Sequence, residues 1–430
     1  MRDRLRAAAI DLRPLRRPNY RRLWFGSSVS VIGTQLTAVA VLLQVYALTK
    51  SSFAVGLVGL FALIGLVGVG LYGGSIADAM DRRRISLLTS SGLALLSVVL
   101  VVQALLDLRS VALLYGVILV QAALFGIDSP SRQAMIPRLI DVSELPAANA
   151  LSQVSMNAGF TIGPLLAGLL VAANHGSYWL PYGIDVLTFA AALYAVWRLP
   201  PMPPAGGGTR AGVASVVEGF RFLGRQPVLL MSFLVDIVAM VFGMPRALFP
   251  ALAGDFYGGG AATVGVLTAA IAVGAVVPVL LSGLLRNVHR HGRAVVVSIV
   301  VWGLAIAAFG LTRRLWLGLL CLAVAGAADA VSAVFRSTIL QEATPDELRG
   351  RLGGVFIVVV AGGPRLGDVE SGSVAALTST EFAVVSGGVA CVFGVLALAA
   401  AVPAFVRFDA RKLRHGQAQL DLVPDAEEPA

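Results

Sequence analysis

The chain has 430 residues, of which 57% are hydrophobic and only 13% are charged. Roughly a quarter of the residues of a soluble domain are charged, so this composition excludes an ordinary soluble protein and indicates that most of the surface faces lipid. The net charge of +9 does not indicate nucleic-acid binding, because the basic residues form short clusters between apolar runs.

Apolar runs long enough to cross a bilayer, which takes roughly 20 residues, follow one another along the chain. They lack the alternation of apolar and polar residues that a membrane barrel requires, so each is predicted to be a helix. The sequence therefore predicts an all-α membrane protein with about twelve transmembrane helices. The predicted spans are 24–48, 53–77, 85–106, 111–127, 148–173, 178–197, 228–250, 263–285, 294–312, 315–339, 354–378 and 382–405.

Lys and Arg residues are concentrated in alternate connections between these spans. Such asymmetry sets orientation, because the basic connections stay in the cytoplasm. We therefore expect a multi-pass protein of the cytoplasmic (inner) membrane with both termini in the cytoplasm. The rich connections contain Arg2 to Arg22, Arg82 to Arg84, Arg286 to Arg293 and Arg407 to Arg414, and the poor ones contain Lys50, Arg109, Arg313 and Arg314.

One long polar interruption divides the spans into two sets of six. It begins with the Pro- and Gly-rich RLPPMPPAGGGTR and continues as GVASVVEGFRFLGRQ, which predicts a short amphipathic helix at the membrane surface. The predicted units are an N-terminal six-helix half (1–197), a cytoplasmic linker (198–226), a C-terminal six-helix half (227–406) and a cytoplasmic tail (407–430).

The two halves repeat one another in sequence. Matching residues first recur at a shift of roughly 209 positions, and later at a slightly shorter shift, which a few deletions explain. An ordered series of this kind predicts two six-helix pseudo-repeats. The pairs are Pro18 with Pro227, Gly56 with Gly265, Gly74 with Gly283, Asp78 with Asn287, Arg84 with Arg293, Arg132 with Arg336 and Gly163-Pro164 with Gly363-Pro364.

The stretch GGSIADAMDRRR, residues 73–84, joins the second and third predicted spans. Its Gly-x-x-x-Asp pattern followed by arginines resembles the loop between the second and third helices of the major facilitator superfamily. The resemblance implies two six-helix halves that hold a substrate between them near the midplane. It also implies a cytoplasmic gate, for which the candidates are Gly74, Asp78, Arg82, Arg83, Asp128 and Arg132. Asp128 is also expected to pair with Arg132 at spacing i, i+4.

A second motif lies in the fifth span, where Gly159, Gly163, Pro164 and Gly168 resemble the Gly-x-x-x-Gly-Pro motif of drug-proton antiporters. Small residues permit close helix crossing and proline bends a helix. A generic packing seam is the alternative interpretation. The fourth span has Gln121 in a stretch where multidrug antiporters have an arginine.

Four further stretches resemble the branch that contains macrolide-efflux and enterobactin-exporter proteins. This resemblance implies an antiporter that exports amphipathic, drug-like or siderophore-like molecules with proton entry, a role in efflux and multidrug resistance. The alternatives are an uptake carrier of the same fold and a non-transporting receptor or scaffold. The stretches are DSPSR from Asp128, ANAL from Ala148, DIVAMVFGMPRALFPAL from Asp236 and GGPRLGDVESG from Gly362.

Charged residues inside spans are candidates for proton coupling or for the substrate cavity, because each costs about 2.5–3.5 kcal/mol at the bilayer centre. We expect Arg365 and Asp368, at i, i+3, to form a structural pair, and Glu370 to be a proton site or a contact for a cationic substrate. Asp236 is interpreted equally well as a proton site or as a partner in an ion pair between helices. The full set is Asp236, Arg246, Asp329, Arg365, Asp368 and Glu370.

Enzyme functions find little support in the sequence. The four histidines lie in loops or the tail without metal-ligand spacing, and no phosphate-binding Gly-x-x-x-x-Gly-Lys motif occurs. The two cysteines lie in apolar runs and predict packed thiols. We therefore expect no enzyme activity, cofactor, metal or nucleic-acid partner. The expected partners are membrane lipid, protons and a small-molecule substrate, and no particular oligomeric state is indicated.

Overall fold

The computed structural model describes residues 11–203, 221, 223–224, 226–280, 288–343 and 349–408, with side chains left undescribed at 70–79, 279–280, 342–343 and 349–358. Within these ranges the chain is helical and contains no strand. The helices are α2 (Pro18–Thr49), α3 (Ser52–Ala79), α4 (Arg82–Leu105), α5 (Val111–Met135), α6 (Leu145–Ala173), α7 (Trp179–Trp197), α9 (Pro227–Phe242), α10 (Phe249–Asp255), α11 (Ala261–Leu280), α13 (His291–Leu311), α14 (Leu315–Ala343), α15 (Arg349–Leu377), α16 (Thr380–Ala401) and α17 (Pro403–Val406), with the 3₁₀ turn η4 (Arg246–Leu248) between α9 and α10.

Local sequence explains where several helices begin. Asp81 caps α4 by accepting hydrogen bonds from two backbone N–H groups of its first turn, and Ser110 and Ser379 cap α5 and α16 in the same way. α2 and α9 instead begin with Pro18 and Pro227, because the fixed backbone angle of proline suits the first helical position.

Eleven helices of the described residues are long and apolar enough to span a membrane. The remaining predicted span, 354–378, corresponds to α15, whose 29 residues are also long enough but include Arg365, Asp368 and Glu370 near the middle. The predicted all-α membrane fold is confirmed. The predicted span 228–250 lies within the candidate span Pro227–Asp255, but its helix is interrupted: α9 ends before Gly243, and the chain turns through Pro245 into η4 and α10. Gly and Pro are the residues at which helices break most readily.

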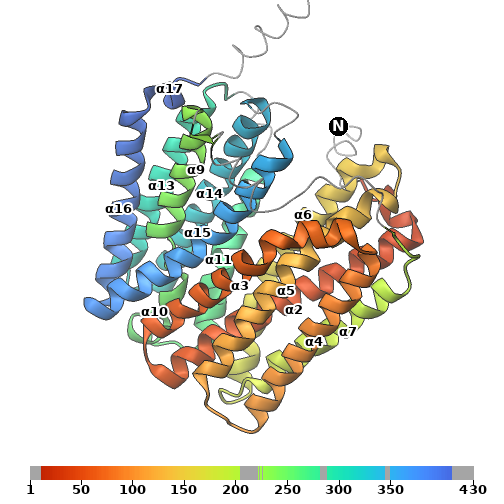
Figure 1. Ribbon diagram of the computed structural model, residues 1–430. Coiled ribbons are helices and arrows are strands. Elements are labelled where there is room, and N and C mark those ends of the chain that lie inside the picture. The colour runs from red at the N-terminus through yellow and green to blue at the C-terminus, as the bar shows by residue number, and fades with distance from the viewer. Residues whose placement is uncertain are drawn as a thin grey trace, which may run out of the picture.

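The described helices form two groups, which we call the N-half (α2–α7) and the C-half (α9–α17) (Figure 1). In the N-half, α2 packs against α6 and α7, and α3 packs against α5. In the C-half, α13 packs against α14 and α16, and α9 packs against α15. The predicted amphipathic helix of the linker lies largely outside the described residues, as does the tail beyond residue 408.

We call the end of the molecule at which α2, α4, α9, α13 and α15 begin the basic end, and the opposite end the outer end. The halves meet through α3 with α15 and through α6 with α11. The closest of these approaches lie toward the outer end, where Gly56 faces the Asp368 carbonyl and Gly168 faces Ala261. Toward the basic end the two groups of helices diverge (Figure 1).

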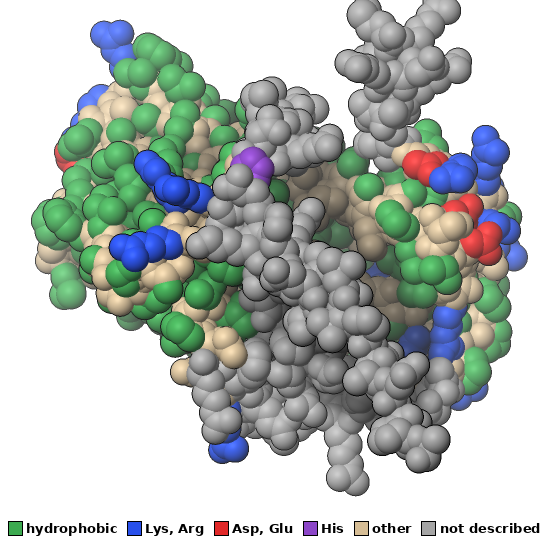
Figure 2. Space-filling model, turned by 90° about the horizontal axis from the view of Figure 1, so that it is seen from above, with side chains coloured by type: hydrophobic (Ala, Val, Ile, Leu, Met, Phe, Trp, Pro, Cys, Tyr) green, Lys and Arg blue, Asp and Glu red, His purple; other side chains and the backbone are tan. Residues whose placement is uncertain are grey.

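Viewed from the basic end, Lys and Arg side chains lie on the described surface of both halves (Figure 2). At this end the chain after α7 docks onto the N-half. The backbone N–H of Met202 donates to the Asp81 carboxylate over 2.9 Å, and Leu199 and Met202 are buried beside Leu23. The first residues of the linker are therefore fixed to the N-half, next to the stretch that the sequence marks as a gate.

Candidate functional site

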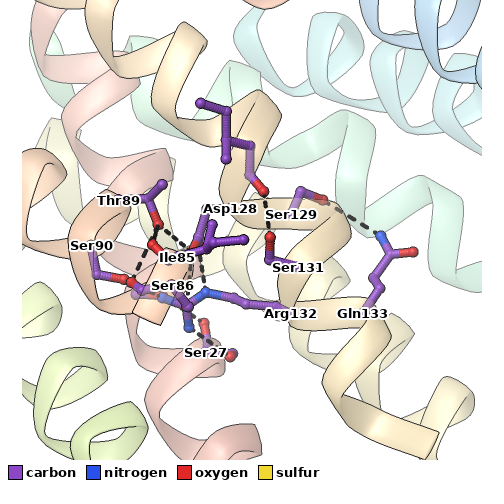
Figure 3. A network of polar contacts seen from close by, with 12 residues as sticks. Ser27, Ile85, Ser86, Thr89, Ser90, Asp128, Ser129, Ser131, Arg132 and Gln133 are labelled. Atoms are coloured by element: carbon purple, nitrogen blue, oxygen red, sulfur yellow. Dashed lines mark hydrogen bonds and ion pairs between the residues drawn. The ribbon is translucent and has the colours of Figure 1, made fainter. Parts of the chain in front are cut away.

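The first buried charge network lies in the N-half, on the last turns of α5. Arg132 Nε lies 2.5 Å from Asp128 Oδ2 at spacing i, i+4, as the sequence predicted. The other carboxylate oxygen of Asp128 accepts hydrogen bonds from the hydroxyls of Ser86 (2.9 Å) and Thr89 (2.7 Å) on α4 (Figure 3). Both carboxylate oxygens of Asp128 thus have partners inside the N-half.

Arg132 extends the same network to two further helices. Its guanidinium donates to Ser27 Oγ on α2 over 3.0 Å and to Ser90 Oγ on α4 over 2.8 Å (Figure 3). The network joins α2, α4 and α5 with each charge paired and hydrogen-bonded, the condition under which buried charges are tolerated.

A second arginine network lies in the C-half. Arg336 on α14 forms an ion pair with Asp236 on α9, and its guanidinium lies 3.7 Å from Asp329 on its own helix. Arg336 and Asp236 are 8% and 3% exposed. Of the two interpretations that the sequence left open for Asp236, the geometry corresponds to an ion pair between helices.

The acids of the two networks occupy different positions of the sequence repeat. Asp236 stands nine positions after Pro227, which begins α9, and Ser27 stands nine positions after Pro18, which begins α2. At this repeat position the N-half therefore has a serine, and the C-half has an acid, in contact with the arginine.

The reverse exchange occurs on the helix of the arginine itself. Asp128 stands four positions before Arg132, and Ser332 stands four positions before Arg336. Ser332 is fully buried, and its hydroxyl has no hydrogen-bond partner among the described residues. Acid and serine have thus exchanged positions between the halves. The repeat-related arginine pairs with an acid on its own helix in the N-half, and with an acid on a different helix in the C-half.

A third cluster lies where η4 meets α15. Asp368, 1% exposed, forms an ion pair with Arg246. The Arg365 guanidinium donates to the Ala361 carbonyl on its own helix over 2.5 Å. The predicted ion pair between Arg365 and Asp368 is therefore wrong: the helix break places Arg246 on Asp368, while the long side chain of Arg365 turns back toward the start of its helix, as helical side chains tend to do.

Two other acids, the buried Asp185 and the half-buried Glu370, have no arginine partner among the described residues. Asp185 accepts hydrogen bonds from the hydroxyls of Thr37, Ser97 and Thr188, which matches a structural role. Glu370 differs, because its Oε2 atom is buried without a hydrogen-bond partner in the described part of the chain.

The candidate gate residues are only partly described. Gly74 and Asp78 lie on α3 where side chains are not described. Arg82 donates to the carbonyl at Ala134, near the end of α5, and Arg83 donates to two carbonyls at the end of α7. These arginines therefore bind helix C-termini, where cations are favoured. The expected gate contact between these arginines and the C-half would form in a state that is closed at the basic end. That contact stays a prediction.

The glycine motif of α6 packs against two different helices. Gly159 and Gly163 face α2, whereas Gly168 faces α11 of the other half: a Cβ atom at Gly168 would lie 2.5 Å from the Ala261 carbonyl oxygen. The Pro164 carbonyl also faces α11. The motif thus serves helix crossing within the N-half and contact between the halves.

One polar cluster has no counterpart in the sequence-based candidates. The amides of Gln44 and Gln103 exchange hydrogen bonds of 3.1 and 3.0 Å, and the Tyr182 hydroxyl donates to Gln44 over 2.7 Å. Only the presence of two Gln residues inside apolar spans indicates such a cluster in the sequence, since the contacts join three separate helices, α2, α4 and α7.

Two helical halves that meet at one end, with charged pairs buried inside them, define a multi-pass membrane transporter. The chain belongs to the transmembrane secretion effector family of the major facilitator superfamily: the family model matches residues 9–426. It is a transporter and not an enzyme.

Known relatives cover nearly the whole chain. The enterobactin exporter EntS of Shigella boydii serotype 18 is 31% identical over 383 residues, which are 89% of this chain and 91% of that protein. EntS of Escherichia coli O81 matches with the same identity and coverage.

Solved structures show the same fold at low identity. The nucleoside transporter NupG superposes with a TM-score of 0.70 at 13% identity and covers 89% of this chain and 98% of its own. A POT family transporter in complex with a thioalcohol-conjugated peptide superposes with a TM-score of 0.72 at 11% identity, covering 89% and 96%.

Proposed function

We propose that this protein exports amphipathic small molecules across the cytoplasmic membrane by alternating access. The basic end is taken to face the cytoplasm, since basic connections remain on that side. The observation that carries the proposal is that the halves approach most closely toward the outer end, through Gly56 and Gly168, and diverge toward the basic end (Figure 1). An exporter loads its substrate from the cytoplasm in such a state.

The substrate class follows from the relatives. The relatives are enterobactin exporters, so siderophore-like molecules are the first class to test, and drug-like amphipathic compounds the second. The substrate would lie between the halves near the midplane, as in other transporters built from repeats.

We further propose that export is coupled to proton entry and that Glu370 exchanges the proton. A residue with this role has to change its charge during the cycle. Asp128, Asp236 and Asp368 are each held by an arginine, whereas no arginine or hydrogen-bond donor contacts the buried Oε2 atom of Glu370 in the described residues. A buried carboxylate without a partner is costly, which favours its neutral form.

The test is transport into inverted membrane vesicles energised by a proton gradient. We expect uptake of enterobactin or of an amphipathic drug that an uncoupler abolishes, and Glu370→Gln is expected to lose the response to the gradient while retaining downhill exchange. Ser373→Ala, on the same helix, serves as the control substitution. Uptake that ignores the uncoupler would contradict proton coupling, and accumulation only in right-side-out vesicles would indicate an uptake carrier.

A further inference from the structure

Arg365 is a cation in the middle of a membrane helix without an acid to neutralise it. Among the described residues, its only hydrogen bond is the one from its guanidinium to the Ala361 carbonyl oxygen. The ion pairs of the described chain include none to Arg365. One backbone carbonyl satisfies one of the five N–H donors of a guanidinium, so most of the hydrogen-bonding capacity of Arg365 is unused.

The nearest acid is already occupied. Asp368 is ion-paired with Arg246, which η4 brings to it, and Arg365 lies close enough to Arg246 and Asp368 for both charges to act on it. Two guanidinium groups therefore lie near one carboxylate that is ion-paired with only one of them, and the cluster of Arg246, Arg365 and Asp368 carries a net charge of +1.

The position of Arg365 makes this excess charge significant. Arg365 stands 16 residues after Arg349 and 12 residues before Leu377, the first and last residues of α15, which places it about 24 Å and about 18 Å from the two ends of the helix at 1.5 Å per residue. That depth is too great for easy access to the headgroups. Intramembrane ionisable residues without a partner are rare and are by default functional.

The turn of α15 before Arg365 packs closely against apolar side chains. Residues 362 and 363 are both glycines and add no side chain to the turn before Arg365, and Met240 and Leu63 are the nearest neighbours of those two positions. Arg365 itself is partly exposed, in a structure whose halves diverge toward the basic end (Figure 1). Beside the ion pair of Arg246 and Asp368, the side chains nearest to this turn are apolar.

We propose that Arg365 binds an anionic group of the transported molecule, so that this protein selects amphipathic anions, such as aromatic carboxylates, over neutral compounds of the same shape. The planar fork of arginine suits a carboxylate or two adjacent oxygens, and the apolar neighbours suit the hydrophobic body of such a molecule. The proposal rests on the export function above and names its substrate class.

A binding experiment separates this proposal from transport. Purified protein in lipid nanodiscs is titrated with 1-naphthoate and with its neutral isostere 1-naphthamide. We expect the wild type to bind naphthoate at least tenfold more tightly than naphthamide. Arg365→Gln is expected to remove the difference, and Arg365→Lys to retain part of it, because a lysine keeps the charge but not the fork. Arg109→Gln, which removes an exposed arginine of an outer connection, is expected to change nothing.

A second arm measures export of the same two compounds from proteoliposomes. Arg365→Gln is expected to lose export of naphthoate and to keep export of naphthamide. Equal affinity of the wild type for both compounds, or an unchanged preference in Arg365→Gln, overturns the proposal. Misfolding of Arg365→Gln, or equal loss of both compounds, also overturns it, because either result makes Arg365 a structural residue. A wild type that binds naphthoate selectively but moves neither compound instead contradicts the export function.

Discussion

Asp236 of α9 forms an ion pair with Arg336 of α14, whereas Arg132, the counterpart of Arg336 in the sequence repeat, pairs with Asp128 on its own helix. Each arginine is closely paired with one acid, and Arg336 has a second acid, Asp329, at 3.7 Å, but the mechanical consequence of the close pair differs. In the C-half the pair ties α14 to the helix that precedes the break at η4. Movements of α9 and α14 are therefore coupled in a way that the N-half does not require.

The first prediction concerns loss of this acid. Asp236→Asn leaves Arg336 buried with only the more distant Asp329, so we expect a loss of about 3 kcal/mol, the lower end of the range for breaking a buried pair. Asp236→Asn combined with Arg336→Gln is expected to recover most of that loss, since no charge is then stranded. Thermal unfolding in nanodiscs measures both. A stable Asp236→Asn with altered dependence of transport on pH would make Asp236 a proton site instead.

The second prediction uses the transposition of acid and serine. Asp236→Ser combined with Ser332→Asp rebuilds in α14 the i, i+4 arrangement of α5, so Arg336 is again paired. We expect the double variant to recover most of the stability that Asp236→Ser alone loses, and to transport more slowly because a hydrogen bond, as between Arg132 and Ser27, then replaces the ion pair that ties α9 to α14. Unfolding curves and initial export rates are the two readouts. Ser332→Asp alone, which adds an unneeded acid, is the control.

If the double variant were no more stable than Asp236→Ser, the equivalence of the two arginine networks would be wrong. If the double variant exported at the wild-type rate, the role of Asp236 would be to neutralise Arg336. The ion pair between α9 and α14 would then be unnecessary for the transport cycle.

Local interactions were predictable from the sequence, and those that depend on tertiary packing were not. The pair of Asp128 and Arg132 follows from spacing on one helix. The apolar runs predicted the all-α membrane fold, because lipid permits only helices or closed barrels. The pair of Asp236 and Arg336 remained one of two alternatives, since its partners are about 100 positions apart and meet only when α9 packs against α14.

The pairing of Asp368 shows why spacing alone can mislead. Arg365 is three positions away on the same helix, but Arg246 reaches the carboxylate from η4 because the chain turns after α9. Gly243 and Pro245 signal a break in sequence. The direction in which the chain continues depends on packing against α3 and α15, which the sequence pattern does not specify.

The third prediction contrasts the two arginines of this cluster. Arg246→Gln strands Asp368, which is 1% exposed, so we expect a loss of about 3–5 kcal/mol. Arg365→Gln strands no acid and is expected to change stability by less than about 1 kcal/mol. Arg246→Gln combined with Asp368→Asn is expected to restore folding. Equal destabilisation by the two single variants would show that Arg365 does share the carboxylate. Thermal unfolding and the yield of monodisperse protein are the measurements.

The last prediction concerns the closure of the outer end. A Cβ atom at Gly56 would lie 2.3 Å from the Asp368 carbonyl oxygen across the contact between the halves, so Gly56→Ala penalises the state seen here by about 1–3 kcal/mol. The population open at the outer end is then expected to rise about 5- to 150-fold. Reactivity of a cysteine introduced at Ser52, in a variant without Cys321 and Cys391, measures the change and is expected to increase.

Two other glycines of α3 provide matched controls for Gly56→Ala. Gly68→Ala is expected to be neutral, because a Cβ atom there meets nothing within 4 Å. Gly65→Ala places a Cβ atom 2.0 Å from the Leu119 carbonyl oxygen inside the N-half, so it is expected to lower stability without favouring either state. If Gly56→Ala lowered stability as Gly65→Ala does and left the reactivity at position 52 unchanged, the contact between α3 and α15 would be a permanent packing contact that does not open during transport.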